Sequence, residues 1–531
     1  MRLGKVYSAL VLLAAGALAV TGCGGSGSSK AANSPAAHPT TVPSATPATE
    51  VIADTVPAGA QRLHFKVGPF PITPGQNSIG FTRRIPEPSQ NGYIVGIQTN
   101  LQYANGTIPA VDVIHLHHGV WLNLSAPDPT SPGLPQRFFA AGEEKTRMLL
   151  PTGYGYKFST DDHWILNYML HNQLSKPSQV WVTYDIDFVP ASSPAASTMK
   201  PAIPIWMDVQ NGSAYPVFDV HQGSGRNGQF NYPDDQPNAY GGGPAKNQWT
   251  LPYNGTLLAT AGHLHPGGLH DDMYLTRAGA TPLPGHGKAE TPNTAHLFES
   301  VANYYEPAGP VSWDMSMTGT PASWRVAVQK GDTLSINTTY DSKLGSWYES
   351  MGIMVVWMAV GDTTGKNPFT TAVDAPGVLT HGHLHENDNH GGKPDPRDYE
   401  NLASAQYPSK VLPSGAVLPI SDFAYQGDMS EAASVPAVVE GGSLTFRNSD
   451  SRLGIPHTVT ACKAPCDLST GIAYPIANGQ PRFDSGELGQ FGPPSSGQVT
   501  WSTPTNLPPG TYTYFCRIHP FMRGAFRVVK P

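Results

Sequence analysis

The sequence predicts a mainly β protein made of several sandwiches or barrels, and three observations support this. The 531-residue chain holds 56 glycines and 52 prolines, and only 13% of its residues are charged. Short runs rich in Val, Thr, Tyr and Trp lie between turns of Gly, Pro and Asn, as in strands joined by tight loops. Long amphipathic runs of Glu, Lys and Ala are absent from the sequence. A chain this long exceeds one hydrophobic core, so we expect about two to four domains.

The charge and the histidine content narrow the class of protein. The formal net charge is −7 and the sequence holds no block of Lys or Arg, which argues against a nucleic-acid partner. The 19 histidines are the unusual feature of the composition, and they are clustered. A histidine in an apolar strand is either a hydrogen-bonded core residue or a metal ligand, because burying an imidazole that has neither a hydrogen bond nor a metal ion costs free energy. Several such histidines together favour a metal.

Residues 1–23 are expected to be an export signal. Arg2 and Lys5 precede an apolar run from about Ala9 to Val20, which is too short to span a membrane. Because the segment ends on Gly-Cys, it resembles a bacterial lipoprotein lipobox. That resemblance implies cleavage before Cys23, lipidation of its sulfur and a protein anchored on the extracytoplasmic face of the cell membrane. Ordinary secretion with a free cysteine is the alternative, and both place the protein outside the cytoplasm.

Residues 24–55 are rich in Gly and Ser, then in Ala, Pro, Thr and Ser, with hardly any aromatic residue. Such a segment cannot bury a core. We expect it to be a disordered tether between the membrane and the globular part.

The first globular unit, residues 56–195, contains the histidine-rich stretch VIHLHHGVWLN at residues 113–123. Its apolar flanks indicate a buried strand. Strict alternation along a strand places His115 on the same face as His117, whereas His117 and His118 form an adjacent pair. A second apolar strand, HWILNYMLHN at residues 163–172, carries His171 near its end.

The second unit, residues 196–375, contains the motif GHLH with His263 and His265. In a strand, side chains two residues apart project from the same face, so this pair can grip one ion. Downstream, WYESMGIMVVWMAVG at residues 347–361 carries Met351, Met354 and Met358. Methionines in such an apolar run are ordinarily core packing.

This order of motifs resembles the type II copper monooxygenases, the family of peptidylglycine α-hydroxylating and dopamine β-monooxygenases. The order is an adjacent histidine pair with a distant histidine, then His-x-His with a distant methionine, and the match covers roughly residues 60–360. The resemblance implies an electron-transfer copper on His117, His118 and His171. It also implies an oxygen-binding copper on His263, His265 and Met351, which makes these three residues catalytic. In the family the two coppers lie across a solvated gap, and a C–H bond of the substrate is hydroxylated with O₂.

The sequence departs from this family at several positions. The arginine that holds the carboxylate of peptide substrates is replaced by Ala261, and a tyrosine after the methionine ligand is replaced by Val355. A peptidyl-glycine substrate is therefore disfavoured, and we expect a small organic substrate of another kind. His115 is an additional histidine and is either a supporting residue or an alternative ligand. His270, beside two aspartates, supports a ligand or belongs to a surface cluster.

Residues 376–417 contain VLTHGHLHENDNHGG, in which His381, His383 and His385 alternate. One interpretation is a solvated linker. The other is a further copper contact at the domain junction, or a lid over the oxygen site. The sequence leaves both interpretations open.

The third unit, residues 418–531, ends with the motif Cys516-x-x-His519-x-x-Met522, and His457 lies upstream. One thiolate, two imidazoles and a weak thioether are the ligand set of a blue-copper electron-transfer site. The loop and the preceding TYTYFC resemble a cupredoxin of the amicyanin or pseudoazurin type. Cys462 and Cys466, in CKAPC, are expected to form a local disulfide in an oxidising compartment, with a metal site as the alternative.

The two resemblances together imply two consecutive jelly-roll-type β sandwiches followed by a cupredoxin Greek-key β sandwich. They imply three copper ions, one type 1 and two type 2, and a monooxygenase whose electrons arrive through the fused type 1 site. Its partners would be O₂, a small organic substrate and a reductant or redox protein. Two other functions stay open: a copper-buffering lipoprotein without turnover, and an electron shuttle that docks a redox partner.

Overall fold

The computed structural model describes most of the globular part of the chain. The described residues are 50–73, 77–174, 176–213, 216–281, 283, 293–305, 310, 312–389, 408–425, 434–453, 455–462, 482–489, 498–519 and 522–531. The expected export signal with Cys23, most of the expected tether, and Cys466 lie outside them. Within these ranges, no helix is both long enough and apolar enough to cross a lipid bilayer.

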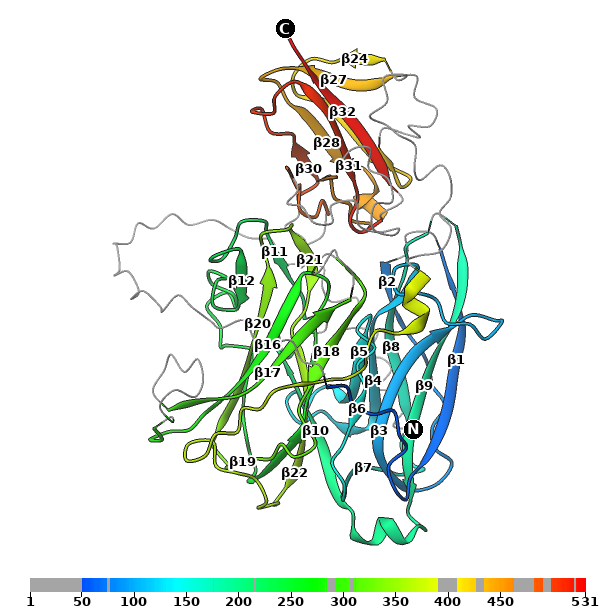
Figure 1. The fold of residues 1–531 in the computed structure, drawn as a ribbon, viewed down its shortest axis with the longest axis vertical. Helices are drawn as coiled ribbons and strands as arrows, with labels where there is room; N and C mark the ends of the chain where they lie inside the picture. The colour runs from blue at the N-terminus through cyan, green and yellow to red at the C-terminus, as the bar shows by residue number, and fades with distance from the viewer. Residues whose placement is uncertain are drawn as a thin grey trace.

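The mainly β prediction is confirmed: the described elements are strands apart from short 3₁₀ turns, and they form three sandwiches (Figure 1). The first sandwich packs the strands β1, β9, β3 and β7, with β6 beside β3, against a sheet of order β2-β8-β4-β5. The bounds are β1 (Gln61–Ile72), β2 (Asn77–Phe81), β3 (Gly92–Gln102), β4 (Ile114–Pro127), β5 (Pro135–Gly142), β6 (Met148–Leu149), β7 (Tyr154–Phe158), β8 (Trp164–Asn172) and β9 (Ser178–Pro190).

The second sandwich continues the first sheet of the first sandwich. Strand β10 pairs in parallel with β7, so that one ten-stranded sheet runs β1-β9-β3-β7-β10-β22-β14-β19 with β6 and β15 at its side. A seven-stranded sheet of order β12-β20-β16-β17-β18-β23, with β13 beside β20, packs on it, and β11 pairs with β21. The bounds are η1 (Pro194–Thr198), β10 (Lys200–Asp208), β11 (Phe218–Val220), β12 (Gln229–Tyr232), β13 (Gln248–Thr250), β14 (Gly255–Ala259), β15 (Gly262–His263), β16 (Gly268–Thr276), β17 (Thr294–Tyr304), β18 (Met315–Gly319), β19 (Val326–Val328), β20 (Thr333–Asp341), β21 (Trp347–Ser350), β22 (Ile353–Val360) and β23 (Val378–Leu379).

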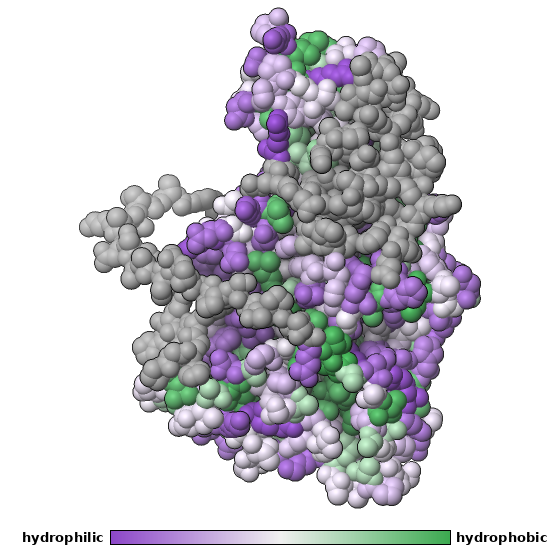
Figure 2. Space-filling model, in the orientation of Figure 1, coloured by the Kyte–Doolittle hydropathy of each residue, from purple (hydrophilic) through white to green (hydrophobic). Residues whose placement is uncertain are grey.

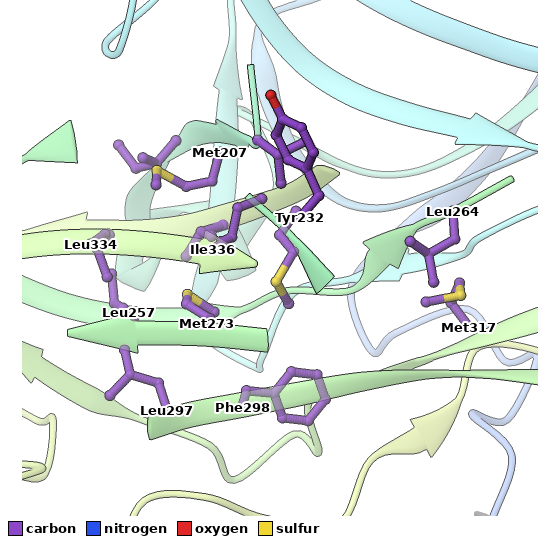
Figure 3. Close-up of a cluster of buried hydrophobic side chains, with 14 of the residues drawn as sticks. Met207, Tyr232, Leu257, Leu264, Met273, Leu297, Phe298, Met317, Leu334 and Ile336 are labelled. Carbon is purple, nitrogen blue, oxygen red and sulfur yellow. The ribbon is translucent and has the colours of Figure 1, made fainter. Parts of the chain in front are cut away.

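Strand β22 is a wall between the two cores, which explains why its sequence is apolar at nearly every position. Met354, Val356 and Met358 belong to the second core, whereas Trp357 and Ala359 belong to the first. Alternating side chains of a strand point to opposite faces, so a strand buried on both faces needs a continuous apolar run. Figure 3 shows the second core, with Met207, Tyr232, Leu257, Leu264, Met273, Leu297, Phe298, Met317, Leu334 and Ile336 gathered between the sheets.

The third sandwich lies at the end of the molecule that carries the C-terminus (Figure 1). Its sheets have the orders β24-β27-β32-β31-β29 and β26-β25-β28-β30, and a core of its own lies between them. On the face drawn in Figure 2, hydrophilic residues are interspersed with small hydrophobic areas. The bounds are β24 (Ser409–Val411), β25 (Ala416–Ser421), β26 (Ala424–Tyr425), β27 (Val435–Val439), β28 (Leu444–Asn448), η5 (Asp450–Leu453), β29 (Thr460–Ala461), β30 (Thr500–Ser502), β31 (Gly510–Phe515) and β32 (Arg523–Val529).

The segment from β23 to the 3₁₀ turn η3 (His385–Asn389) ties the first two sandwiches together. Lys145 donates to Glu386 at 2.9 Å, which joins the segment to the first sandwich. His383 Nε2 lies 2.8 Å from Asp314 Oδ2, and the Asn387 side chain donates to Asp314 Oδ1 at 2.9 Å, which joins it to the second. Through these contacts the segment bridges the junction between the two sandwiches, with His383 in contact with Asp314 although its side chain is 37% exposed.

Replacing Trp357 with alanine is expected to destabilise the two joined sandwiches by about 3–5 kcal/mol, because it empties a large volume of the first core. Trp357 is 1% exposed. Val360→Ala at the end of the same strand is the control, because Val360 is 49% exposed and such surface changes cost within about 0.5 kcal/mol. Urea unfolding gives the free energy of unfolding of both variants. An equal decrease in the two would contradict the role of β22 as a strand buried between two cores.

Candidate metal centre

Strand β4 carries three histidines, and an irregularity in its pairing with β8 aims them into one region. His115 pairs with His171 and Leu116 with Leu170, but the next pair is His118 with Met169, so His117 is the extra residue of a β-bulge. In a regular strand, His117 and His118 would point to opposite faces. A bulge bends the strand and redirects side chains. It therefore allows adjacent histidines to contribute to the same site.

The β4 histidines lie within reach of His171 and His265. The ligand atoms of His115, His117 and His171 all lie within 4.8 Å of one another, and so do those of His117, His118 and His265. His115 Nε2 is 3.1 Å from His171 Nδ1, and the rings of His117 and His171 stack with centroids 4.2 Å apart. The two groups share His117.

His263 and His265 complete the arrangement from the second sandwich. Their Nε2 atoms are 3.2 Å apart, and the His265 ring centroid is 3.9 Å from that of His117. His263 ends β15, which pairs with β22 at the wall between the cores. We call the six side chains His115, His117, His118, His171, His263 and His265 the six-histidine centre. The structure thus differs from the separated pair of sites that the family resemblance implies, since the two histidine groups form one contiguous centre.

Met351 lies beside this centre and is connected to it through the backbone. Its side chain is buried with Trp206, Val217 and Ile353 in a small apolar cluster. The Tyr340 hydroxyl donates to the Met351 carbonyl at 2.6 Å and accepts from the backbone N–H of His265 at 3.1 Å. The ligand role of the Met351 sulfur stays a prediction.

Burial makes five of the six imidazoles of the centre neutral. It lowers the pKa of His115 and of His118 to about 3. It also holds the pKa values of His117, His171 and His265 well below their ordinary range, with neighbouring imidazoles adding to the effect. A neutral imidazole offers a lone pair, which is the form that binds a metal ion.

Buried carboxylates surround the histidines. Glu144 Oε1 lies 3.0 Å from His263 Nδ1, so a proton on Nδ1 leaves the Nε2 lone pair directed at the centre. Glu143 Oε2 lies 3.5 Å from His117 Nδ1, and Glu349 Oε2 lies 4.0 Å from His117 Nε2. Burial, followed by the charge of Glu144, raises the pKa of Glu143 well above its usual range. The sequence analysis missed these acids, although Glu143-Glu144 directly follow an apolar strand.

The residues of the centre fit a metal ion. Both ring nitrogens of His117 and the Nδ1 atom of His265 are buried without a hydrogen-bond partner in the structure. Buried polar atoms are nearly always paired, so such nitrogens need another partner. Convergent imidazoles suit copper, zinc, iron and nickel. Copper, as expected from the sequence, is compatible with this donor set.

A second candidate site lies in the third sandwich. The ligand atoms of His457, Cys516 and His519 lie within 4.8 Å of one another, with Cys516 Sγ 3.9 Å from His457 Nδ1 and 3.8 Å from His519 Nδ1. The Thr458 backbone N–H donates to the sulfur at 3.3 Å, and Asp450 Oδ2 lies 2.9 Å from His457 Nε2. We call this group the Cys516 site.

The Cys516 site favours a thiolate. Burial raises the pKa of Cys516, but hydrogen bonds and charges from the two histidines together bring it well below its usual range. Met522 is buried, and its backbone closes the loop: its N–H donates to the His519 carbonyl at 2.8 Å, and its carbonyl accepts from Cys516 at 3.1 Å. The thioether role of Met522 stays a prediction. Cys462 is disulfide-bonded, and its expected partner Cys466 lies outside the described residues.

The loop of the Cys516 site packs on the second sandwich. The Arg517 guanidinium lies 4.7 Å over the Trp347 ring and donates to Asp484 Oδ2 at 2.8 Å. The Ser346 backbone N–H donates to the same oxygen at 2.7 Å, and Phe515 is buried in the second core. Trp347 begins β21, the strand that presents Glu349 to His117. One short strand thus contacts both His117 and Arg517, the residue next to Cys516.

A cavity of about 40 Å³ lies beside His263. Ala261 and Val355, the positions where the family's peptide-binding residues are replaced, both line it. A water molecule needs roughly 10–15 Å³ of such space, so the cavity admits a molecule of about the size of O₂. Its other apolar lining residues include Phe139, Met148, Leu149, Ala259, Ile353 and Trp357.

Comparisons with known proteins add little to this geometry. No family model and no curated protein match the chain. Among solved structures, the Cu(I) form of an amicyanin mutant is 23% identical, with a TM-score of 0.15, over 22% of this chain and 83% of that chain. The reduced state of another amicyanin mutant is 26% identical, with a TM-score of 0.13, over 22% of this chain and 82% of that chain. The assignment of the Cys516 site therefore depends on its own geometry.

Replacing Gly142 with alanine is expected to weaken metal binding at the six-histidine centre by about tenfold or more, a loss typical of disturbed ligand support. A Cβ atom there would lie 2.3 Å from the His117 carbonyl oxygen and 2.8 Å from His263 Cε1. Gly133→Ala is the control, because a Cβ atom at Gly133 meets nothing within 4 Å. Copper titration followed by elemental analysis measures both variants, and a Gly142→Ala protein with wild-type affinity would contradict the predicted crowding.

Proposed function

We propose that the chain is an extracytoplasmic, copper-dependent oxidoreductase that uses O₂. In this proposal the Cys516 site passes electrons to the six-histidine centre, where a C–H bond of a small substrate is hydroxylated. The extracytoplasmic location follows from the export signal expected at residues 1–23, and the lipidation of Cys23 remains part of the proposal.

The observation that carries this proposal is the contact of both candidate sites with β21. Arg517, next to Cys516, packs on Trp347, and Glu349 two residues further along faces His117. A thiolate–histidine site beside a cluster of neutral imidazoles suits one-electron delivery to an oxygen-binding centre. A protein that only carried electrons to a partner would not need a cluster of six buried histidines.

Copper held by these residues would supply one-electron redox chemistry and O₂ binding. The chain's own residues would prepare the site. Glu144 orients His263, burial keeps His117 and His265 neutral, and the packed walls exclude bulk water. In hydroxylation, one oxygen atom of O₂ enters the C–H bond and the other leaves as water, which consumes a pair of electrons from the reductant and a pair of protons.

The lining of the cavity beside His263 favours an apolar substrate group over a charged one. Ala261 and Val355 offer it no charge or hydroxyl group, and its nearest aromatic walls are Phe139 and Trp357. The one lining arginine, Arg147, donates to the Ala53 carbonyl at 2.9 Å and lies 3.0 Å from Asp54 and 3.5 Å from Asp187. A carboxylate-bearing peptide would therefore meet no free cation among these residues. The reductant is a small molecule or a redox protein outside the cytoplasm.

Two substitutions test the electron path and the oxygen site. Cys516→Ser and His263→Ala are each expected to slow O₂ consumption by copper-loaded protein with reductant by at least about tenfold, because each removes a ligand donor. His64→Ala is the matched control, since His64 is an exposed strand histidine paired with Asp185. Oxygen-electrode rates provide the measurement. Wild-type rates for His263→Ala would refute the oxygen site, and wild-type rates for Cys516→Ser alone would refute the relay.

Copper binding without turnover is the second candidate function. The small size of the cavity favours it, since about 40 Å³ leaves little room for an organic substrate without rearrangement. Copper per chain separates the two functions. Three tightly held ions with O₂ consumption support the enzyme, whereas clearly more ions without consumption support buffering.

A further inference from the structure

A second cluster of metal-binding side chains lies on β16 and β17, in the seven-stranded sheet. Asp271 and Met273 of β16 are fully buried, and the alternate residues His270 and Asp272 point to the opposite face. In β17, the pairing skips Leu297, because Met273 pairs with Phe298 and Tyr274 with His296. This bulge allows Leu297 and Phe298 both to enter the core, while His296 joins the face of Asp272.

Four side chains meet on that face. Asp272 Oδ2 lies 2.9 Å from His270 Nδ1, and Asp272 Oδ1 lies 2.9 Å from His296 Nε2. Glu299 Oε1 lies 3.5 Å from His270 Nδ1. The ligand atoms of His270, Asp272 and Glu299 all lie within 4.8 Å of one another. These three side chains are therefore close enough to hold one ion, and His296 fixes the second oxygen of Asp272.

The two carboxylates of this cluster would be stabilised by a cation between them. Asp272 and Glu299 are directly opposite each other in the antiparallel register, and like charges at such positions destabilise a sheet. The Asp272 side chain is only 1% exposed, so solvent screens this repulsion poorly. A divalent cation between the carboxylates would turn the repulsion into attraction. One imidazole and two carboxylates are ligands that Zn²⁺ accepts, and the paired strands β16 and β17 hold them in place.

We propose that His270, Asp272 and Glu299 form a binding site for a divalent cation of the Zn²⁺ class, with His296 orienting the Asp272 carboxylate. The site is separate from the six-histidine centre, because it lies on the other face of β16 from Asp271. That buried aspartate lies close to Gly262, where a Cβ atom would be 2.5 Å from Asp271 Oδ2. A cation at this site would brace β16 and β17 behind the loop that carries His263 and His265. The proposal involves no redox step and is independent of the proposed function.

The test compares zinc binding by the full chain after its copper sites have been loaded. Wild-type protein, Glu299→Gln and His296→Gln are equilibrated with Zn²⁺, dialysed and measured for zinc and copper per chain. We expect wild-type protein to retain one more zinc ion than either variant, or to bind that ion at least about tenfold more tightly. His64→Gln is the control, because His64 forms a 2.6 Å strand-to-strand pair with Asp185 and is expected to leave zinc binding unchanged.

A second measurement keeps the result interpretable if one variant folds poorly. Far-ultraviolet circular dichroism reports whether each variant is folded, and only variants with the wild-type spectrum are compared. Zinc is also expected to raise the thermal midpoint of the wild type and the control, but not that of the two variants. Equal zinc content in wild type and both variants would overturn the proposal. So would zinc lost equally by the His64→Gln control.

Discussion

The parallel pairing of β7 with β10 is the contact on which the rest of the architecture depends. It makes one sheet out of two sandwiches, so β22 separates their cores and β15 is hydrogen-bonded to the same wall. His263 is therefore held in a fixed register relative to the first sandwich, where β4 presents His117. Backbone hydrogen bonds fix β15 within the ten-stranded sheet, and the packing of that sheet on the β2-β8-β4-β5 sheet sets the distance between the two histidine groups. A centre built in this way is preorganised before any metal arrives.

Burial has opposite effects on the donors and on their surroundings. Burial lowers the pKa of His117, which leaves a neutral imidazole that can bind a metal, and it raises the pKa of Glu143, which favours the protonated acid. A metal ion would offset the cost of enclosing so many polar groups, because it supplies both a partner for the imidazole nitrogens and positive charge for the carboxylates. In the Cys516 site, burial raises the pKa of the thiol, but hydrogen bonds and charges from His457 and His519 outweigh it and favour the thiolate.

The sequence predicts the mainly β class because turn residues and β-branched runs are local signals. It also singles out His117, His118, His171, His263 and His265, which the structure brings together, but their ligand roles depend on metal binding. The bulge at His117 leaves no local trace, so alternation alone could not place His115, His117 and His118 around one region. The closeness of the two histidine groups depends on the β7–β10 pairing and on the packing of two sheets against each other, which are long-range contacts that no local pattern encodes. The positions of the Met351 and Met522 sulfur atoms depend on packing in the same way.

The burial of His519 has a consequence for the proposed electron relay. This side chain is 1% exposed, and the neighbouring Arg517 is stacked on the chain's own Trp347. In the proposed relay, electrons would leave the Cys516 site on this covered side, and an external donor would have to approach another side of the third sandwich. Electrons would then enter and leave on separate faces, which would give their flow a single direction.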